Sequence, residues 1–266
     1  MLKVNSISKT FGIGTINEKL ALDNISFSLE EGEFLTIIGG NGAGKSTLLN
    51  CISGVHNVDK GNIFLDSKNI TYMPEYKISK EIGRVFQDPL RGTAFDMTIE
   101  ENLSIALSKG RRRGLRKGIH KSDRNFLREQ VALLGLGLED RMKNKVGLLS
   151  GGQRQALTLL MATIVKPKLL HLDEHTAALD PSIAAKVLSL TKTIVKEHNI
   201  CTMMITHNMN HALEYGTRTI MMNEGRIILD IKGKERENMT VDSLIEQFSK
   251  KSGTRLNNDR MLLKED

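Results

Sequence analysis

The chain has 266 residues, of which 39% are hydrophobic and 26% charged, and its formal net charge is +7. This length and composition are typical of a globular protein with one large domain, or with a core and a subdomain, and allow a substantial buried core. The chain has no Trp and its aromatic content is 4%. This composition argues against a surface that binds nucleic acid by stacking on bases.

Other features of the chain indicate a cytosolic protein. The N-terminus lacks the basic and then apolar pattern of a signal peptide. The longest uncharged apolar run, residues 156–165, has about half the length that a membrane-spanning helix needs. Cys51 and Cys201 are far apart and indicate neither a disulfide framework nor a metal cluster.

The net charge comes from one segment, residues 109–121, which holds seven basic side chains and no acidic one. They are Lys109, Arg111, Arg112, Arg113, Arg116, Lys117 and Lys121. A solvated basic loop is the first interpretation, and contact with anionic lipid headgroups is the second. Binding of RNA or DNA comes third, because no aromatic residue is interleaved with the charges.

In chain order, the hydrophobic pattern alternates between strands and helices. Residues 2–7 and 21–29 predict strands on either side of a turn-rich segment, residues 12–18. Further strands are expected at 34–38, 61–65, 84–86, 168–172, 201–205, 219–222 and 226–231. Helical periodicity runs from about 88 to 165, before Pro167, and returns at 183–197 and 240–248. This order predicts an α/β core with a helical insertion, followed by a polar tail at 249–266.

A glycine-rich run joins the expected strand at 34–38 to a helical pattern that begins at 46–49. It matches the phosphate-loop pattern G-x-x-x-x-G-K-[S/T] and consists of Gly39, Gly40, Asn41, Gly42, Ala43, Gly44, Lys45, Ser46 and Thr47. Successive backbone N–H groups and a helix N-terminus favour an anion there. Lys45 can then reach the β- and γ-phosphates of a nucleotide, and the Ser46 hydroxyl can bind Mg²⁺.

Gln87 follows the strand at 84–86, and four further motifs come after it in a fixed order. The first, L-S-G-G-Q-R-Q, occupies residues 149–155. The apolar run L-L-H-L-D-E at 169–174 leads into A-A-L-D at 177–180, and Thr206-His207 ends the next strand. From the residues alone, the chain is a hydrolase of a magnesium–nucleotide complex. With L-S-G-G-Q-R-Q, the set over residues 2–248 resembles the ATP-binding cassette (ABC) ATPases.

The resemblance implies a fold and a domain organisation. We expect an α/β phosphate-loop NTPase core with a mainly parallel sheet, an N-terminal antiparallel β subdomain and an inserted α-helical subdomain at about 88–165. Residues 1–248 would form the ATPase domain and 249–266 the tail.

The resemblance also assigns roles to residues near the nucleotide. Asp173, at the end of an apolar strand, would hold Mg²⁺ through water opposite Ser46, and Glu174 would polarise the attacking water. Gln87 resembles the residue that contacts Mg²⁺ and water and senses the membrane partner. His207 resembles the histidine that contacts the γ-phosphate, although a lone histidine is more often a core residue. Phe11 fits the aromatic residue that stacks on adenine, with a plain core position as the alternative.

The L-S-G-G-Q motif implies an assembly of two subunits. Ser150 is expected to cap a helix whose N-terminus, with Gly151, Gly152 and Gln153, forms a second anion site. In the family this site meets the ATP of the opposite protomer, and Asp180 helps to couple the two sites. We therefore expect an ATP-dependent dimer, formed with a second copy or with another ATPase subunit.

One position departs from the family pattern. After Asp173-Glu174 the family has Pro-Thr, whereas this chain has His175-Thr176. We expect a more mobile loop with an exposed, tolerated His175, and a pH-sensing role is the alternative.

The resemblance extends to one branch of importer ATPases. Gly137-Leu138-Glu139-Asp140-Arg141 and the segment 175–181 are similar to amino-acid importers that pair with a branched-chain-type permease and a ligand-capturing lipoprotein. This implies a peripheral protein at the inner face of the cell membrane, bound to a permease helix near residues 88–103, with no nucleic-acid partner. The alternatives are a soluble cassette ATPase of DNA repair, cofactor assembly or translation, and a nucleotide-gated subunit without turnover. The solute itself is specified by subunits absent from this chain.

Overall fold

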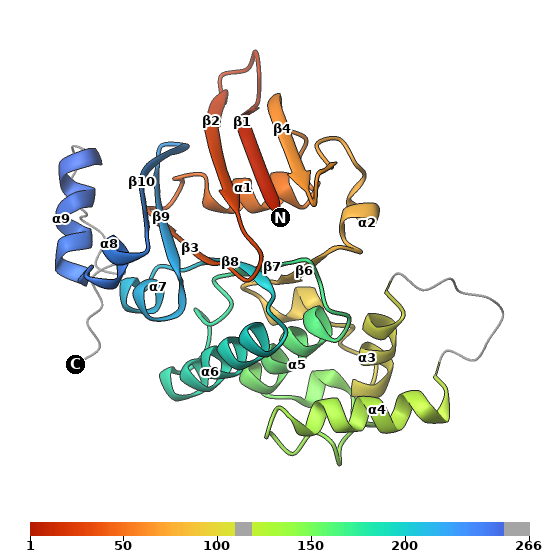
Figure 1. Cartoon of the computed structure of the whole chain (residues 1–266). Helices are drawn as coiled ribbons and strands as arrows, with labels where there is room; N and C mark the ends of the chain where they lie inside the picture. The colour runs from red at the N-terminus through yellow and green to blue at the C-terminus, as the bar shows by residue number, and fades with distance from the viewer. Residues whose placement is uncertain (110–118, 253–266) are drawn as a thin grey trace. The chain divides into compact units, whose positions relative to one another are not determined.

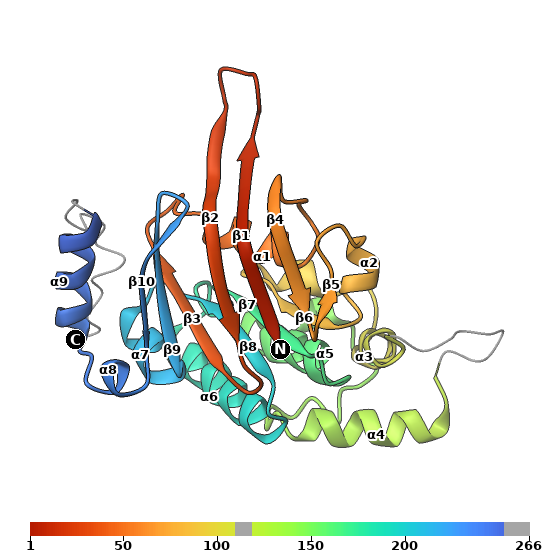
Figure 2. The ribbon, with the colours of Figure 1, turned by 45° about the horizontal axis from the view of Figure 1, so that its top comes forward.

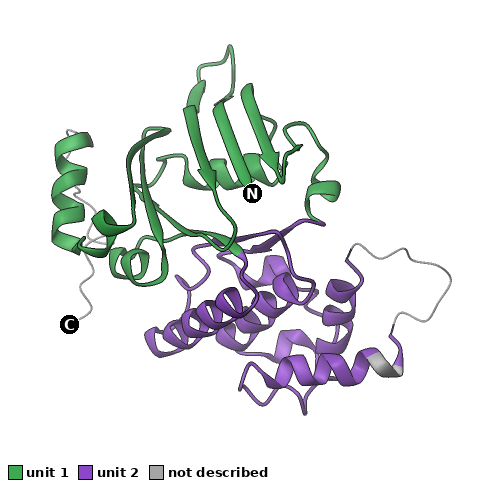
Figure 3. Ribbon diagram, in the orientation of Figure 1, with its two compact units in different colours: residues 1–79, 201–266 green, residues 80–200 purple. Residues whose placement is uncertain are grey.

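The computed structural model describes residues 1–109 and 119–252. The chain forms two compact units, residues 1–79 with 201–266 and residues 80–200 (Figure 3). The second unit is inserted in the first along the sequence, between residues 79 and 201.

A four-stranded antiparallel sheet of strand order β2-β1-β4-β5 forms part of the first unit. Its strands are β1 (Leu2–Phe11), β2 (Lys19–Leu29), β4 (Lys60–Leu65) and β5 (Lys68–Asn69). Val4 lies opposite Phe27 on one side and Ile63 on the other. β1 and β2 extend past the predicted strands into a long hairpin (Figure 2). The predicted N-terminal antiparallel sheet is therefore confirmed.

The mainly parallel strands of the first unit have the order β10-β9-β3-β8. They are β3 (Phe34–Gly39), β8 (Cys201–Ile205), β9 (Arg218–Asn223) and β10 (Arg226–Lys232). β3 pairs in parallel with β8 and β9, and β10 pairs antiparallel with β9. Every residue of β3 and β8 is buried, as expected for continuous apolar runs in a parallel sheet.

Helices complete the first unit. They are α1 (Lys45–Ile52), α2 (Glu75–Ile78), α7 (Met209–Tyr215), α8 (Lys234–Glu237) and α9 (Val241–Ser252). α9 lies beside β10 (Figure 1), and its Leu244 and Phe248 are buried in a cluster with Met221 and Ile231. The short helices α2, α7 and α8 are not in the sequence prediction, because one or two turns contain too little periodicity to recognise.

The second unit contains the parallel pair β6 (Ile82–Val85) and β7 (Leu169–Asp173). Its helices are α3 (Ile99–Leu107), α4 (Lys121–Ala132), α5 (Gly151–Thr163) and α6 (Pro181–Glu197). Short 3-10 turns occur at η1 (Pro89–Gly92) and η2 (Val146–Leu148). Leu103, Leu127, Val131 and Leu157 from α3, α4 and α5 share a buried core. The predicted α/β fold class is confirmed.

Two details differ from the sequence predictions. α9 continues to Ser252, past the expected end at 248, and the ion pair of Lys250 with Glu246 at 2.6 Å lies one turn apart in this extension. Lys109 is half-buried, and its ammonium donates to the carbonyl of Ile82 at 3.0 Å, so it is not a solvated member of the basic segment. Burial lowers the pKa of Lys109, and the charge of Glu81 opposes this effect. The arginines at 111–113, Arg116 and Lys117 lie outside the described residues.

Candidate nucleotide-binding site

The phosphate loop lies between β3 and α1, and its inner side is packed against backbone. At Gly39, where φ is +151°, a Cβ atom would lie 2.3 Å from the carbonyl oxygen of Met222. At Gly44, where φ is +99°, it would lie 2.5 Å from the carbonyl oxygen of Ala21. Only glycine combines these φ angles with such close backbone contacts, so these two positions fix the shape of the loop.

The outer side of the same loop is open. A Cβ at Gly40 would have no heavy atom within 4 Å, and Asn41, Gly42 and Ser46 are exposed. No side chain caps the N-terminus of α1, so its first amides are available to bind an anion. A polyphosphate therefore fits against this loop.

Lys45 is the buried cation of the loop. It is 5% exposed, and its ammonium donates to the carbonyls of Gly39 at 2.9 Å and Gly40 at 3.1 Å. The position that a Cβ of Gly42 would occupy is 3.5 Å from the ammonium of Lys19, at the start of β2. Lys19 is a second cation beside the loop that no sequence motif indicated, because only the hairpin of β1 and β2 carries it there.

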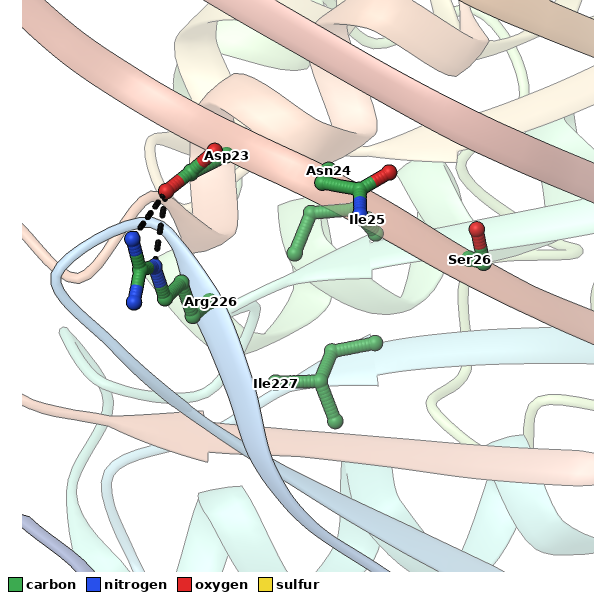
Figure 4. Close-up of a pocket in the computed structure, with 6 residues that line it drawn as sticks. All are labelled: Asp23, Asn24, Ile25, Ser26, Arg226 and Ile227. Carbon is green, nitrogen blue, oxygen red and sulfur yellow. Dashed lines mark hydrogen bonds and ion pairs between the residues drawn. The ribbon is translucent and has the colours of Figure 1, made fainter.

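A turn between β9 and β10 supports the loop from the side. The amide of Gly225 donates to the carbonyl of Ala43 at 3.1 Å, and its carbonyl accepts from the amide of Asp23 at 2.9 Å. Arg226 forms an ion pair with Asp23 at 2.6 Å. These two residues line a cavity of about 560 Å³ together with Asn24, Ile25, Ser26 and Ile227 (Figure 4). None of the predicted nucleotide-binding residues lines this cavity. The cavity therefore belongs to the turn that supports the loop, and not to the phosphate-facing side of the loop.

His207 comes two residues after the end of β8, and β8 ends at the same edge of the sheet as β3, which leads into the phosphate loop. Ile205 at the end of β8 is in register with Ile37 of β3, and the amide of Thr206 donates to the carbonyl of Ile37 at 3.2 Å. His207 follows and is half-buried, and Asn208 caps α7 by accepting from the amide of His211 at 3.1 Å. The carboxyl ends of parallel strands are where ligands of α/β proteins bind.

Phe11 ends β1 and has polar neighbours. Its ring meets the ring of His56 edge-on, with the centroids 5.2 Å apart. The ammonium of Lys9 lies 5.5 Å from the centroid of Phe11 and forms an ion pair with Asp59 at 2.9 Å. Phe11 is half-buried, so it is not a fully enclosed core residue.

In the second unit, Gln87 and Asp173 follow or end neighbouring parallel strands. Val85 and Leu172 are in register across β6 and β7, which places Gln87 and Asp173 at the same edge of this pair. Gln87 is exposed and Asp173 half-buried. Asp88 accepts from the amide of Leu90 at 2.9 Å and so begins the turn η1.

Glu174 has an unusual backbone conformation. Its φ is +46°, in the left-handed region that few non-glycine residues occupy. Such strained positions gather at functional sites, where the surrounding structure holds them. No motif or spacing in the sequence predicts this strain.

The L-S-G-G-Q motif begins α5, as the sequence predicts. Ser150 is the N-cap and accepts from the amide of Gln153 at 3.3 Å, and the Gln153 side chain accepts from the amide of Ser150 at 3.1 Å. Gly152 is buried, and a Cβ there would lie 2.1 Å from Cγ2 of Ile183 in α6. The helix that this motif begins, called the signature helix below, therefore packs closely against α6 (Figure 1).

The segment from Glu174 to Asp180 consists of short turns. The amide of Ala177 donates to the carbonyl of Glu174 at 3.0 Å, and the amide of Leu179 donates to that of Thr176 at 3.2 Å. Exposed Asp180 precedes Pro181, the first residue of α6. His175 is 2% exposed, so the expectation of an exposed, tolerated side chain is wrong. Its ring is enclosed because this segment turns back onto α6.

Each residue predicted to bind magnesium offers an oxygen ligand. Ser46 belongs to the first unit and Gln87 and Asp173 to the second, and oxygen is the ligand type that Mg²⁺ prefers. Among the residues that the structure describes, no three His, Cys, Asp or Glu side chains gather as a metal site. A magnesium ion that takes its other ligands from nucleotide phosphates and water needs no such cluster.

Within residues 1–109 and 119–252, no helix has the length and apolar content to cross a membrane.

Comparisons with known proteins identify the family of this chain. The family model described as "ABC transporter" matches residues 22–177. The tyrosine transport ATP-binding protein of Clostridioides difficile is 48% identical over 93% of this chain and 98% of its own length. An energy-coupling factor transporter ATP-binding protein of Acetivibrio thermocellus is 32% identical over 85% of this chain and 78% of its own length.

Solved structures show the same fold. The dimeric ATP-binding cassette MJ0796 bound to ADP and Pi has a TM-score of 0.75 and 29% identity, over 87% of this chain and 98% of that chain. The cassette cbiO1 of Clostridium perfringens, part of the transporter complex cbiONQ, has a TM-score of 0.73 and 28% identity, over 99% and 98%. The chain therefore belongs to the ABC transporter family, as an ATP-binding subunit that hydrolyses ATP to drive transport.

Proposed function

We propose that this chain energises the uptake of tyrosine or a closely related amino acid through a separate membrane permease. The observation that carries this proposal is the 48% identity to a tyrosine transport ATP-binding protein, over nearly the full length of both chains. A shared cassette fold would support only ATP-driven transport in general. The extent and level of this identity support the narrower assignment.

The described residues support a division of roles around ATP and Mg²⁺. The glycine-rich loop and Lys45 hold the phosphates, and Phe11 stacks on adenine. Ser46 and Gln87, with Asp173 through water, would hold Mg²⁺, and the ion would supply positive charge beside the phosphate oxygens. Glu174 orients and polarises the attacking water, and His207 contacts the γ-phosphate.

A dimer completes the proposed site. A related cassette is dimeric with ADP and Pi bound. The capped N-terminus of α5, with Ser150, Gly151, Gly152 and Gln153, is an anion site that would meet the nucleotide of the opposite protomer. Asp180 would link the two sites. The partner is a second copy or another ATPase subunit.

The permease is proposed to dock near residues 88–103. This segment exposes Leu90 (48%) and Phe95 (49%), two large apolar side chains that a permease helix could cover. Such docking would place the chain at the inner face of the membrane, with an extracellular solute-binding protein completing the system.

Uptake of labelled tyrosine in the source cells tests the proposal. We expect Lys45→Ala to abolish ATP-dependent tyrosine uptake, because the phosphates lose their buried cation. Lys68→Ala, at an exposed position of β5, is the matched control and should transport normally. Unchanged tyrosine uptake in Lys45→Ala would overturn the proposed solute.

A pull-down from solubilised membranes, with the Glu174→Gln chain and ATP, tests the proposed partner. We expect a polytopic permease to be recovered. Recovery of soluble or nucleic-acid-bound partners in its place would favour a soluble cassette ATPase.

A further inference from the structure

His175 has a buried side chain in the segment that links the proposed water-polarising residue to α6. It is 2% exposed, and its Nε2 lies 3.3 Å from Oγ1 of Thr191, itself 1% exposed. Thr191 is in the third turn of α6, 16 residues further along the chain. A side chain at this position thus connects the turn after β7 to the body of the helix.

The direction of this hydrogen bond follows from the partners of Thr191. The Thr191 hydroxyl has one proton and donates it to the carbonyl of Val187 at 2.8 Å. Its oxygen can therefore only accept from the ring. His175 must carry a proton on Nε2, and the contact requires a donor at that position of the side chain.

The segment from Glu174 to Asp180 holds the proposed water-polarising residue at one end and, at the other, the residue proposed to link the two sites. Glu174, with φ at +46°, directly precedes His175, and its carbonyl accepts from the amide of Ala177. The turns end at Asp180, whose carbonyl accepts from the amide of Ala184 at 2.8 Å in the first turn of α6. A strained residue between a strand end and short turns keeps its conformation only if its surroundings hold it.

We propose that His175 is a positioning residue, which holds Glu174 in its left-handed conformation through the hydrogen bond to Thr191. A proline, which the family has at this position, restricts the backbone through its own ring. Here a side-chain hydrogen bond to α6 supplies the restraint. The proposal rests on the role of Glu174 stated above.

Steady-state ATPase kinetics of the purified full-length chain test this proposal. We expect His175→Phe and Thr191→Val each to lower kcat about 10-fold, the scale at which residues that orient a ligand or base affect activity. KM for ATP should stay within about 2-fold, because the phosphate loop is untouched. His175→Gln places an amide N–H near the position of Nε2 and should restore kcat to within about 3-fold of the wild type.

Further variants separate positioning from a loss of fold. Thr163→Val is the matched control, because Thr163 is a buried threonine of α5 whose hydroxyl donates to the carbonyl of Leu159 at 2.8 Å, and it should leave kcat unchanged. In the double variant His175→Phe/Thr191→Val, kcat should fall no further than in either single variant, since both remove the same contact. Additive losses, or no rescue by His175→Gln, would overturn the proposal.

Glu174→Gln distinguishes a failure of this inference from a failure of the assigned base. If Glu174→Gln is inactive while His175→Phe keeps the wild-type kcat, the base stands and the positioning role is wrong. If Glu174→Gln keeps the wild-type kcat, the assignment of the base is wrong, and His175 has no catalytic group to position. Neither result depends on the identity of the transported solute.

Discussion

His171 lies in the middle of β7, two residues before Asp173, and is fully buried. Its position in the strand is in register with Arg84 of β6. Burial, together with the smaller effect of the nearby charge of Arg84, lowers the pKa of His171 to about 3. The folded protein therefore holds this side chain neutral throughout the physiological range.

This pKa predicts an acid dependence of stability. Below the ordinary pKa of about 6.5, the unfolded chain binds a proton at His171 that the folded chain does not bind. The free energy of unfolding should therefore fall as the pH decreases from about 6.5 toward about 3. Above about pH 6.5, the neutral His171 causes no loss of stability. Between pH 7.5 and 5 the loss from this residue is about 2 kcal/mol.

Urea unfolding at the two pH values measures this effect. His171→Leu should lose about 2 kcal/mol less than the wild type between pH 7.5 and 5. The control His198→Leu replaces an exposed histidine after α6 and should behave as the wild type. An identical pH dependence in His171→Leu and the wild type would contradict a neutral, buried His171.

At the scale of elements, the signature helix α5 and α6 are held at close range by glycine. Ile183 is β-branched, so its Cγ2 has little freedom to move from the position that a Gly152 side chain would need. A Cβ at Gly151, by contrast, would lie 3.5 Å from Cδ2 of Leu179, an ordinary contact. Neighbouring glycines of one motif therefore have different structural roles.

Gly152→Ala should destabilise the protein by about 1–3 kcal/mol, the usual effect of an extra carbon in a filled site. Gly151→Ala should be neutral or slightly stabilising, since alanine favours a helix. Urea unfolding of the two variants at one pH compares them directly. Equal midpoints would mean that α5 and α6 separate easily, and would contradict the close seating inferred here.

For the whole molecule, the proposed function predicts that a second protomer completes each nucleotide site. Glu174→Gln should lower ATP turnover by about 10²-fold or more, because the glutamine amide cannot act as a general base. Its side-chain oxygen can still accept a hydrogen bond from the attacking water. ATP should then stay bound and hold the dimer together. Light scattering after gel filtration, with and without ATP and Mg²⁺, measures this change in mass.

The control is Glu197→Gln, at an exposed position at the end of α6. This variant should hydrolyse ATP at the wild-type rate, and its mass in light scattering should match that of the wild type with and without ATP. A monomeric Glu174→Gln chain in the presence of ATP would argue for a dimer with a different ATPase subunit. A Glu174→Gln chain that hydrolyses ATP at the wild-type rate would show that another group acts as the base.

The sequence alone determined the phosphate loop, the order of the motifs and most strands, because these depend on local chemistry. Lys45 must follow glycines for the loop to form, and the apolar runs of β3 and β8 are continuous enough to predict buried parallel strands. The cap Ser150 was also predictable, since a serine three residues before Gln153 satisfies amides within one turn.

Only the tertiary structure decided what His175, Lys19 and Gly152 contact. His175 was expected to be an exposed, tolerated residue, yet its side chain is buried against Thr191, which lies in a helix 16 residues further along the chain. Lys19 reaches the phosphate loop only because a hairpin carries it there, and Gly152 meets Ile183 only because α5 and α6 pack closely. Such contacts join segments far apart in the chain, and no local pattern of residues records where the folded chain brings those segments together.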